Sequence, residues 1–229
     1  MTLDARKRQR KIERRKAKDR TRKQEQSRDN SRDLAVRLER SVTAPILHCC
    51  TIDALRREGI GNVLFSRELP GGNVAFAAFL VDMYCLGVKD VFMDVAMRSR
   101  YDWKIHGSMF RDYKPVQLRP ECAVKLVEGA AAYAGNLGLA PHPDYHKAKR
   151  IFGDIDAGLC PQEFVYGKEG KPFFVAGPHE TPTRCNQILR TLTDRCGPDG
   201  FHYLMPMAAN TMIREIEDID DVAGYLGEE

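Results

Sequence analysis

The sequence feature that most constrains the fold is an uninterrupted run of eight apolar residues from Val74 to Val81. No apolar run in the chain is longer, and a bilayer takes about 20 residues to cross, so the sequence predicts no membrane span. A run of this length between turn residues is typical of a β-strand that is covered on both faces. We therefore predict a central, buried strand here.

Two further segments with strand character flank this run. Asn62–Leu69 precedes it across the tight turn Pro70-Gly71-Gly72, and Val88–Ala96 follows it after Leu86-Gly87. Connections this short join antiparallel neighbours. The sequence predicts an antiparallel β-meander over about residues 62–96.

Helix signals surround the meander. Pro120 is expected to start a helix that ends before Gly138, and its apolar residues recur at helical spacing. That stripe comprises Ala123, Val127, Ala130, Ala134 and Leu137. Thr181-Pro182 is a typical N-cap and first-turn pair for a second long helix that Gly197 closes.

Shorter elements complete the expected fold class. We expect short helices between Thr51 and Gly59 and between Pro143 and Gly153. A later β-hairpin is expected over residues 163–176, with a turn at Gly167–Gly170. The sequence thus predicts an α+β fold, in which the meander and this hairpin pack against several helices.

Charge is distributed very unevenly along the chain. Residues 1–40 contain 16 Lys and Arg against 7 Asp and Glu, whereas the other 189 residues contain 20 against 25. The net charge of +4 is therefore a +9 segment averaged with a −5 remainder. We predict a basic arm, helical or disordered, over residues 1–42 and a single α+β domain over residues 46–229.

The basic arm is the candidate nucleic-acid-binding region. Its densest part lies between residues 6 and 23, where 12 of 18 residues are basic: Arg6, Lys7, Arg8, Arg10, Lys11, Arg14, Arg15, Lys16, Lys18, Arg20, Arg22 and Lys23. Such a segment neutralises phosphates and releases counterions without reading sequence. The leading hypothesis is an RNA- or ribosome-associated protein, with DNA as the other nucleic acid that the arm would bind. A module that docks its arm on an acidic protein partner is an alternative.

Carboxylates near the meander support a different alternative. Asp82 follows the buried run, Asp90 lies on the third strand, and Asp154 lies in a Gly-Asp-Ile-Asp segment. Metal-dependent nucleases and phosphodiesterases gather carboxylates at strand ends to hold Mg²⁺ around a phosphate. The same residues also have structural interpretations, because Asp90 follows Lys89 and forms a surface pair with it, and Asp154 suits a turn. The sequence therefore assigns no enzymatic activity.

Other cofactor signals are weak. His142 and His146 have the spacing of two zinc ligands, but Pro143 is expected to leave His142 outside the following helix. No glycine-rich nucleotide motif occurs, so we predict no bound cofactor apart from Mg²⁺ in the nuclease alternative. The seven cysteines, without a secretory signal, predict reduced thiols in a cytoplasmic protein.

Overall fold

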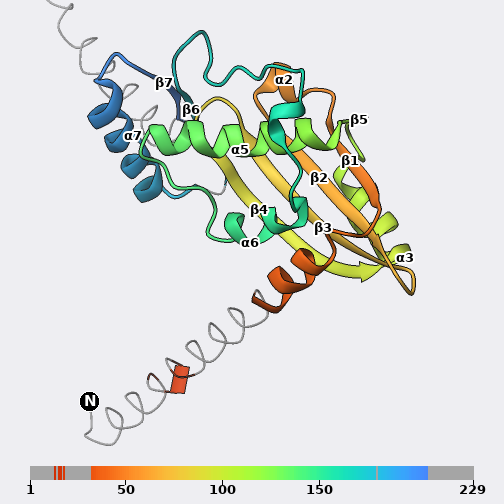
Figure 1. The fold of residues 1–229 in the computed structure, drawn as a ribbon. Coiled ribbons are helices and arrows are strands. Elements are labelled where there is room, and N and C mark those ends of the chain that lie inside the picture. Colours follow the sequence, from red (N-terminus) through yellow and green to blue (C-terminus); the bar gives the residue numbers. More distant parts are fainter. Residues whose placement is uncertain (1–12, 14, 17, 19–31, 179, 206–229) are drawn as a thin grey trace, which may run out of the picture.

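The computed structural model describes residues 13, 15, 16, 18, 32–178 and 180–205. Its main element is a five-stranded antiparallel sheet with strand order β4-β3-β2-β1-β5 (Figure 1). The five strands are β1 (Ile46–Ile52), β2 (Ile60–Leu69), β3 (Asn73–Asp82), β4 (Gly87–Met97) and β5 (Pro115–Gln117). The predicted α+β class and its meander are confirmed, since β2, β3 and β4 pair consecutively.

The central strand is buried as its composition predicts. From Val74 to Val81 every side chain except Leu80 is at most 4% exposed. Phe76 contacts Tyr101 on one face, with ring centroids 5.4 Å apart, and Phe79 contacts Phe152 on the other, at 5.3 Å. Both faces of the sheet are therefore covered, which is the condition for a strand without polar alternation.

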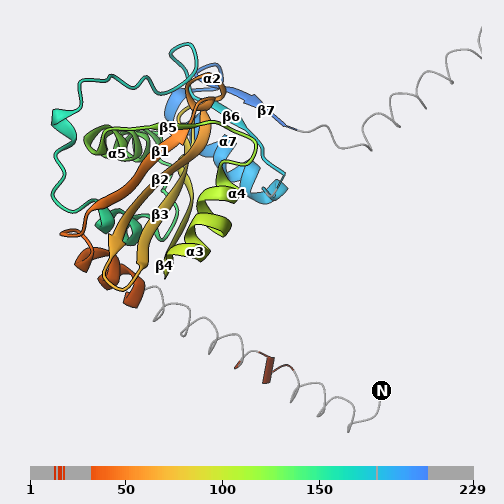
Figure 2. The ribbon, with the colours of Figure 1, turned by 90° about the vertical axis from the view of Figure 1, so that its right-hand side faces the viewer.

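Helices cover the two faces of this sheet (Figures 1 and 2). One face carries α5 (Pro120–Asn136), α6 (Tyr145–Ala148) and the 3-10 turn η2 (Lys149–Phe152). The other carries α3 (Arg98–Arg100), the π-helical turn η1 (Tyr101–His106) and α4 (Gly107–Met109). The short elements α2 (Leu55–Glu58) and η3 (Ala157–Leu159) lie in connections. The apolar stripe predicted for the helix after Pro120 is confirmed, because all five of its residues are buried.

Helix α5 approaches the sheet closely at Gly87, the first residue of β4. Its φ is +66°, and an added Cβ would lie 2.6 Å from the carbonyl oxygen of Ala130 and 2.7 Å from Cβ of Ala134, both on α5. Any other residue would push α5 away from the sheet in addition to straining the backbone. This contact holds α5 against the turn between β3 and β4.

The short helix expected between Thr51 and Gly59 is present only in the second half of that span, as α2. Thr51 caps no helix but lies in β1, opposite Val63 of β2, because pairing with β2 outweighs the local helix signals. Only the short α2 precedes Gly59, whose φ of +73° closes it. The signals for the cap at Gly59 were local, whereas the strand depends on a distant partner.

The prediction of a β-hairpin over residues 163–176 was wrong. A single bridge between Lys168 and Lys171 marks the turn, and β6 (Phe173–Val175) pairs in parallel with β7 (His202–Leu204). Tyr166, expected in the first hairpin strand, donates instead to the carbonyl oxygen of Leu126 at 3.0 Å. The segment before the turn is therefore anchored to α5 and is not available for pairing.

A second, smaller core lies at one end of the sheet, where α7 (Pro182–Cys196), β6 and β7 pack (Figure 1). It joins the turn between β3 and β4, the C-terminal part of α5, β6 and α7. Its buried side chains are Cys85, Leu86, Ala134, Leu137, Leu139, Phe174, Cys185, Ile188, Leu192 and Phe201. The main core and this second core adjoin at α5, which contributes buried side chains to both and so links the described elements into a packed unit.

The end of the basic arm packs on this unit. Residues 32–40 are helical, Leu38 is fully buried in the main core, and Glu39 pairs with Arg150 at 2.9 Å. Of the twelve predicted phosphate-binding residues, the structure describes Arg15, Lys16 and Lys18, which are helical and exposed. The other nine lie outside the described residues. Within the described residues, no helix is long and apolar enough to cross a membrane.

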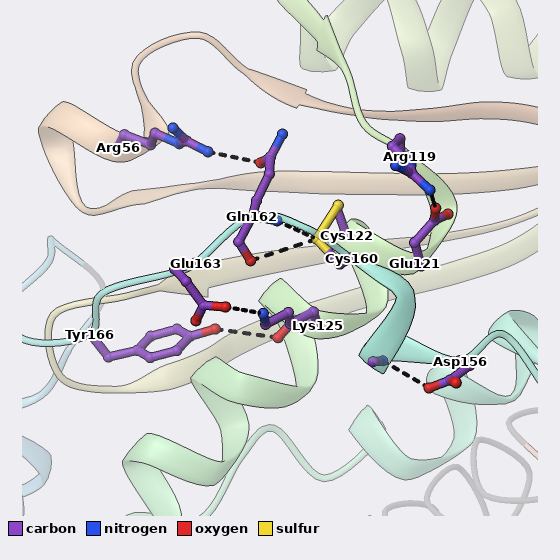
Figure 3. The surroundings of a disulfide bond; sticks show 11 residues. Arg56, Arg119, Glu121, Cys122, Lys125, Asp156, Cys160, Gln162, Glu163 and Tyr166 are labelled. Carbon is purple, nitrogen blue, oxygen red and sulfur yellow. Dashed lines mark hydrogen bonds and ion pairs between the residues drawn. A yellow bond between two sulfur atoms is a disulfide. The ribbon is translucent and has the colours of Figure 1, made fainter.

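The cysteines depart from the expectation of seven free thiols. Cys122 in α5 and Cys160 after η3 form a disulfide with a Cα–Cα distance of 4.9 Å (Figure 3). No local pattern predicts this pair, because its members are separated by 38 positions in sequence and are brought together by packing of η3 on α5. The other five cysteines are free, and four of them are buried. The cytoplasmic location, which relied on reduced cysteines, stays a prediction.

Candidate ligand-binding cavity

A cavity of about 690 Å³ opens where β3 ends and β4 begins. It lies between this end of the sheet and the second core, and residues of both contribute to its wall. Most of the wall is apolar and includes Leu80, Leu86, Val88, Leu139, Phe173 and Ile188. The partial exposure of Leu80, which interrupts the buried run of β3, is explained by its place in this wall.

A β-bulge shapes the cavity floor. Leu80 of β3 pairs with Asp90, but the next residue, Val81, pairs with Val88, so Lys89 is an extra residue in β4. In a regular strand, successive side chains point to opposite faces. The bulge breaks this alternation, and Val88, Lys89 and Asp90 all line the cavity.

Asp82 is the most deeply placed carboxyl group of the wall, at 7% exposure. Its Oδ1 accepts hydrogen bonds from the backbone N–H of Tyr84, at 2.9 Å, and of Cys85, at 3.0 Å. These bonds form the turn that leads from β3 to β4. Burial raises the pKa of Asp82 above its ordinary value, and the backbone donors and Lys89 oppose that shift without cancelling it.

Lys89 and Glu180 form an ion pair across the cavity. Their Nζ and Oε1 atoms are 2.6 Å apart, and both side chains are largely buried. Glu180 also accepts a hydrogen bond from the backbone N–H of Gly177. The pair therefore ties the segment between β6 and α7 to the bulge in β4, and it neutralises the charge of Lys89.

His142 and Asp90 meet at the rim. Nε2 of His142 lies 3.5 Å from Oδ1 of Asp90, while its Nδ1 accepts a hydrogen bond from the backbone N–H of Asp144 at 3.2 Å. The backbone N–H of His142 also donates to the carbonyl oxygen of Val88 at 2.9 Å. These contacts hold the loop after α5 against the edge strand β4, and they place an imidazole N–H at the cavity entrance.

The structure brings some of the predicted site residues together. Asp82, Asp90 and His142 line the same cavity, whereas Asp154 and His146 do not. Asp90 contacts His142 and not Lys89, contrary to the expected surface pair. No group of three or more His, Cys, Asp or Glu side chains among the described residues is arranged to hold a metal ion.

Sequence reasoning missed Glu180 and Arg184 as cavity residues. They come from the segment between β6 and α7, about 90 residues after the bulge that they face. Arg184 follows the helix cap at Thr181, whose side chain accepts from its N–H. That cap is a structural signal, and no local pattern links either residue to β4.

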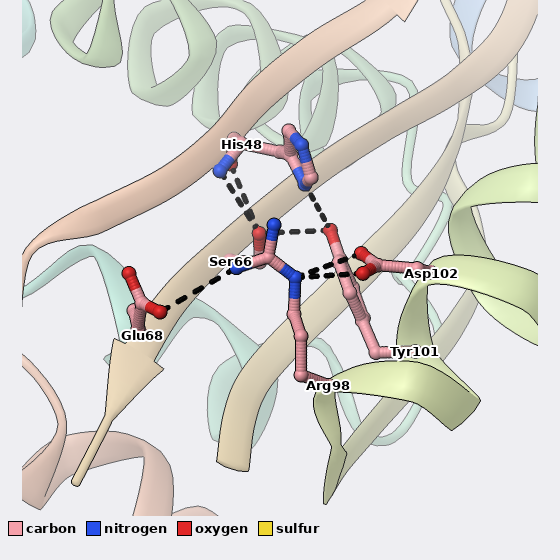
Figure 4. A network of polar contacts seen from close by, with 6 residues as sticks. All are labelled: His48, Ser66, Glu68, Arg98, Tyr101 and Asp102. Atoms are coloured by element: carbon pink, nitrogen blue, oxygen red, sulfur yellow. Dashed lines mark hydrogen bonds and ion pairs between the residues drawn. The ribbon is translucent and has the colours of Figure 1, made fainter. Parts of the chain in front are cut away.

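A second polar network lies on the other side of the molecule's sheet and involves η1 (Figure 4). The buried Tyr101 hydroxyl donates to Ser66 Oγ at 2.9 Å, and Nδ1 of His48 lies 2.9 Å from the same hydroxyl oxygen. Ser66 also accepts from the backbone N–H of His48 at 3.0 Å. Burial and the stacked ring of His106 lower the pKa of His48.

This network has a structural role. The Ser66 hydroxyl is fully buried and engaged by two donors, so it is not placed to attack a substrate. Arg98 binds both carboxylate oxygens of Asp102, at 3.0 and 2.8 Å, and reaches Glu68 of β2 at 3.5 Å. Together these contacts hold residues 98–109 against β1 and β2, and none of these side chains lines the cavity.

Comparison with known proteins adds no functional assignment. No family model, no curated protein and no solved structure matches this chain.

Proposed function

We propose that the domain binds a small, mainly apolar molecule in the cavity at the junction of β3 and β4. The observation that carries this proposal is the cavity itself, which has about 690 Å³ of space and an apolar wall interrupted by a few polar side chains. Ligand sites typically have 300–1,000 Å³ and this kind of lining. A buried carboxyl group with a shifted pKa in such a cavity is a further supporting feature.

The test is to fill the cavity. Val175 lines it from β6 and is 44% exposed, so Val175→Trp adds volume without replacing a core residue. Leu204→Trp is the matched control, because Leu204 pairs with Val175 in β7 but does not line the cavity. Saturation-transfer NMR with 2-phenylethanol should show binding to the wild type and to Leu204→Trp, and about tenfold weaker binding to Val175→Trp. Equal binding to both variants, or none to the wild type, would contradict the proposal.

A second function is proposed for the basic arm, which would bind the phosphates of RNA or DNA. The supporting observation is its charge, since residues 1–31 contain 13 Lys and Arg against 5 Asp and Glu. Binding of this kind weakens steeply as salt rises, because released counterions drive it. An acidic protein partner is the competing outcome, and titration with poly-glutamate in place of RNA distinguishes the two.

The phosphodiesterase alternative has less support. Asp82 and Asp90 share the cavity, but Asp154, the third proposed Mg²⁺ ligand, is not part of its wall. Asp82 also already accepts two backbone hydrogen bonds. We therefore assign the cavity carboxylates to ligand recognition.

A further inference from the structure

We infer that the ligand of this cavity is an organic cation, an apolar molecule whose ammonium group is held by the carboxylate of Asp82. This inference rests on the proposed ligand-binding function and specifies the chemistry of the ligand. It depends on three observations: a buried, rigidly held carboxyl group in the cavity wall, an excess of negative charge in the wall, and the neutralisation of the nearest cation.

The first observation concerns the carboxyl group of Asp82. Its Oδ1 accepts hydrogen bonds from the backbone N–H groups of Tyr84 and Cys85, and the backbone N–H of Leu86 also stabilises the carboxylate. The residue is 7% exposed and lines the cavity. The carboxylate therefore lies at the border of an apolar space, in a position fixed by the backbone.

The orientation of this carboxylate is set in advance. The N–H groups of Tyr84 and Cys85 hold Oδ1 in the turn, so the carboxyl plane cannot rotate freely. A group held in this way loses little conformational freedom when it binds a donor. Asp82 thus has the arrangement of a recognition group and not of a turn residue alone.

The second observation is the charge of the wall. Its cations are Lys89 and Arg184, whereas its carboxyl groups are Glu58, Asp82, Asp90 and Glu180. With His142 neutral, the formal charge of the lining is −2. Water-poor, apolar walls strengthen the field of such charges, which attracts a cation and repels an anion.

The third observation is that the two buried carboxyl groups of the wall, Glu180 and Asp82, differ in their counterions. Glu180 is neutralised by Lys89 at 2.6 Å, and this contact also uses the charge of Lys89. Among the described residues Asp82 forms no ion pair, and the charge of Lys89, which is shared with Glu180, only partly offsets the cost of its burial. A buried carboxylate without a full counterion is costly, so an ammonium group beside Asp82 would supply the missing charge.

The neighbouring side chains suit the rest of such a molecule. Tyr84 and Phe173 both line the cavity, with ring centroids 6.4 Å apart. Aromatic rings attract cations through their faces and accommodate apolar groups. Leu80 and Val88 extend the apolar surface beside Asp82 and would cover the hydrocarbon part of the ligand.

The test compares three probes of similar shape on the full chain: 2-phenylethylamine, 2-phenylethanol and 3-phenylpropionate. Titrations followed by saturation-transfer NMR, in phosphate buffer to avoid competing amines, should give a dissociation constant for the amine about tenfold below that of the alcohol. The anion should bind more weakly than either. Equal affinities for amine and alcohol, or tightest binding of the anion, would overturn the inference.

Asp82→Asn tests whether the Asp82 carboxylate causes the preference for the amine. Asparagine keeps an acceptor for the two backbone N–H groups, so the turn is retained while the charge is lost. This variant should bind the alcohol as the wild type does and lose the tenfold preference for the amine. Asp94→Asn is the matched control, because Asp94 is on the same strand as the bulge but outside the cavity wall. A preference that persists in Asp82→Asn would refute the role of Asp82.

The outcomes distinguish a failure of the inferred positive charge of the ligand from a failure of the proposed ligand-binding function. If the alcohol binds the wild type and the amine binds no better, the cavity binds ligands and the inferred charge is wrong. If none of the probes binds the wild type, the cavity proposal fails and the inference fails with it. Should Asp82→Asn not fold, as judged by circular dichroism, the order of the three affinities in the wild type decides the inferred charge.

Discussion

At the scale of single residues, the buried polar side chains differ in whether they border the cavity. The buried guanidinium of Arg67 donates to three carbonyl oxygens, those of Ala44, Ile151 and Phe152. Ser66 is likewise fully engaged, and neither residue lines the cavity. Asp82 differs because it lines the cavity and because burial raises its pKa in spite of its backbone donors. Full satisfaction away from a cavity indicates a structural role, whereas a buried carboxyl group in a cavity wall supports recognition.

The raised pKa of Asp82 predicts a pH-dependent cost to stability. The charged form is penalised by burial, with Lys89, Cys85 and Tyr133 as its ionisable neighbours. The stability of the wild type relative to Asp82→Asn is therefore highest below the ordinary aspartate pKa of about 4, and is lost as pH rises through the raised pKa. At neutral pH, without ligand, the variant should therefore have a higher Tm than the wild type.

Thermal unfolding by circular dichroism between pH 4 and pH 8 measures this difference. The difference in Tm between the wild type and Asp82→Asn should become smaller as the pH falls. Asp94→Asn controls for the general effect of removing one negative charge from the domain. A lower Tm for Asp82→Asn at every pH would mean that the carboxylate stabilises the fold, contrary to this prediction.

At the scale of elements, the bulge in β4 is the feature that forms the site. One extra residue at Lys89 turns three consecutive side chains toward the cavity. Gly87, two residues earlier, allows α5 to approach, and so places the loop after α5 near the rim. A regular strand here would direct either Lys89 or Asp90 away from the cavity.

The disulfide between Cys122 and Cys160 joins two elements, α5 and the segment after η3 (Figure 3). Closing a loop of 38 residues restricts the unfolded chain and should stabilise the fold by about 3–4 kcal/mol. Dithiothreitol should therefore lower the Tm of the wild type, and it should have no effect on the Cys122→Ser, Cys160→Ser double variant. Alkylation of all seven cysteines in unreduced, denatured protein would show that the bond is absent.

The elements also differ in how well the sequence predicts them. The helix after Pro120 and the three strands of the meander follow local patterns of apolar residues, turns and caps, and all are confirmed. In contrast, β1 depends on pairing with β2, and β6 on parallel pairing with β7 about 30 residues later. Short strands of this kind are selected by their partners, so local propensity does not identify them.

At the scale of the whole molecule, the boundary between the arm and the domain decides how the arm can be tested. Leu38 is fully buried, so deleting residues 1–40 would open the main core. Deleting residues 1–31 leaves Leu38 in place and still removes 13 of the chain's 36 basic residues. The shorter deletion should keep the wild-type Tm, whereas the longer one should cost about 2–5 kcal/mol, the usual cost of losing a buried leucine.

Deleting residues 1–31 tests the proposed binding of polyanions by the arm while leaving the main core in place. Fluorescence anisotropy with single-stranded RNA and duplex DNA between about 50 and 200 mM salt should show steep salt dependence for the full chain. The deleted protein should bind both far more weakly, with a smaller slope. Unchanged affinity after the deletion would contradict phosphate binding by the arm, and tighter binding of poly-glutamate than of RNA would favour an acidic protein partner.

The sequence by itself determined the meander, the long helix on the sheet and the division of charge between arm and domain. These features depend on contiguous residues: an apolar run, glycine and proline turns, helical spacing and a count of charges. Asp82, Asp90 and His142 were candidates on the same basis, although for metal ligation. The sequence shows the type of each residue but not which other residues it contacts in the fold.

Only the tertiary structure decided which of these residues form a site. The bulge at Lys89, the approach of Glu180 and Arg184 from another segment, and the burial of Asp82 in the cavity wall all depend on packing between segments far apart in the chain. The same holds for the disulfide and for Leu38 in the main core. The physical reason is that burial and hydrogen-bond satisfaction are properties of a residue's surroundings, which the chain acquires only on folding.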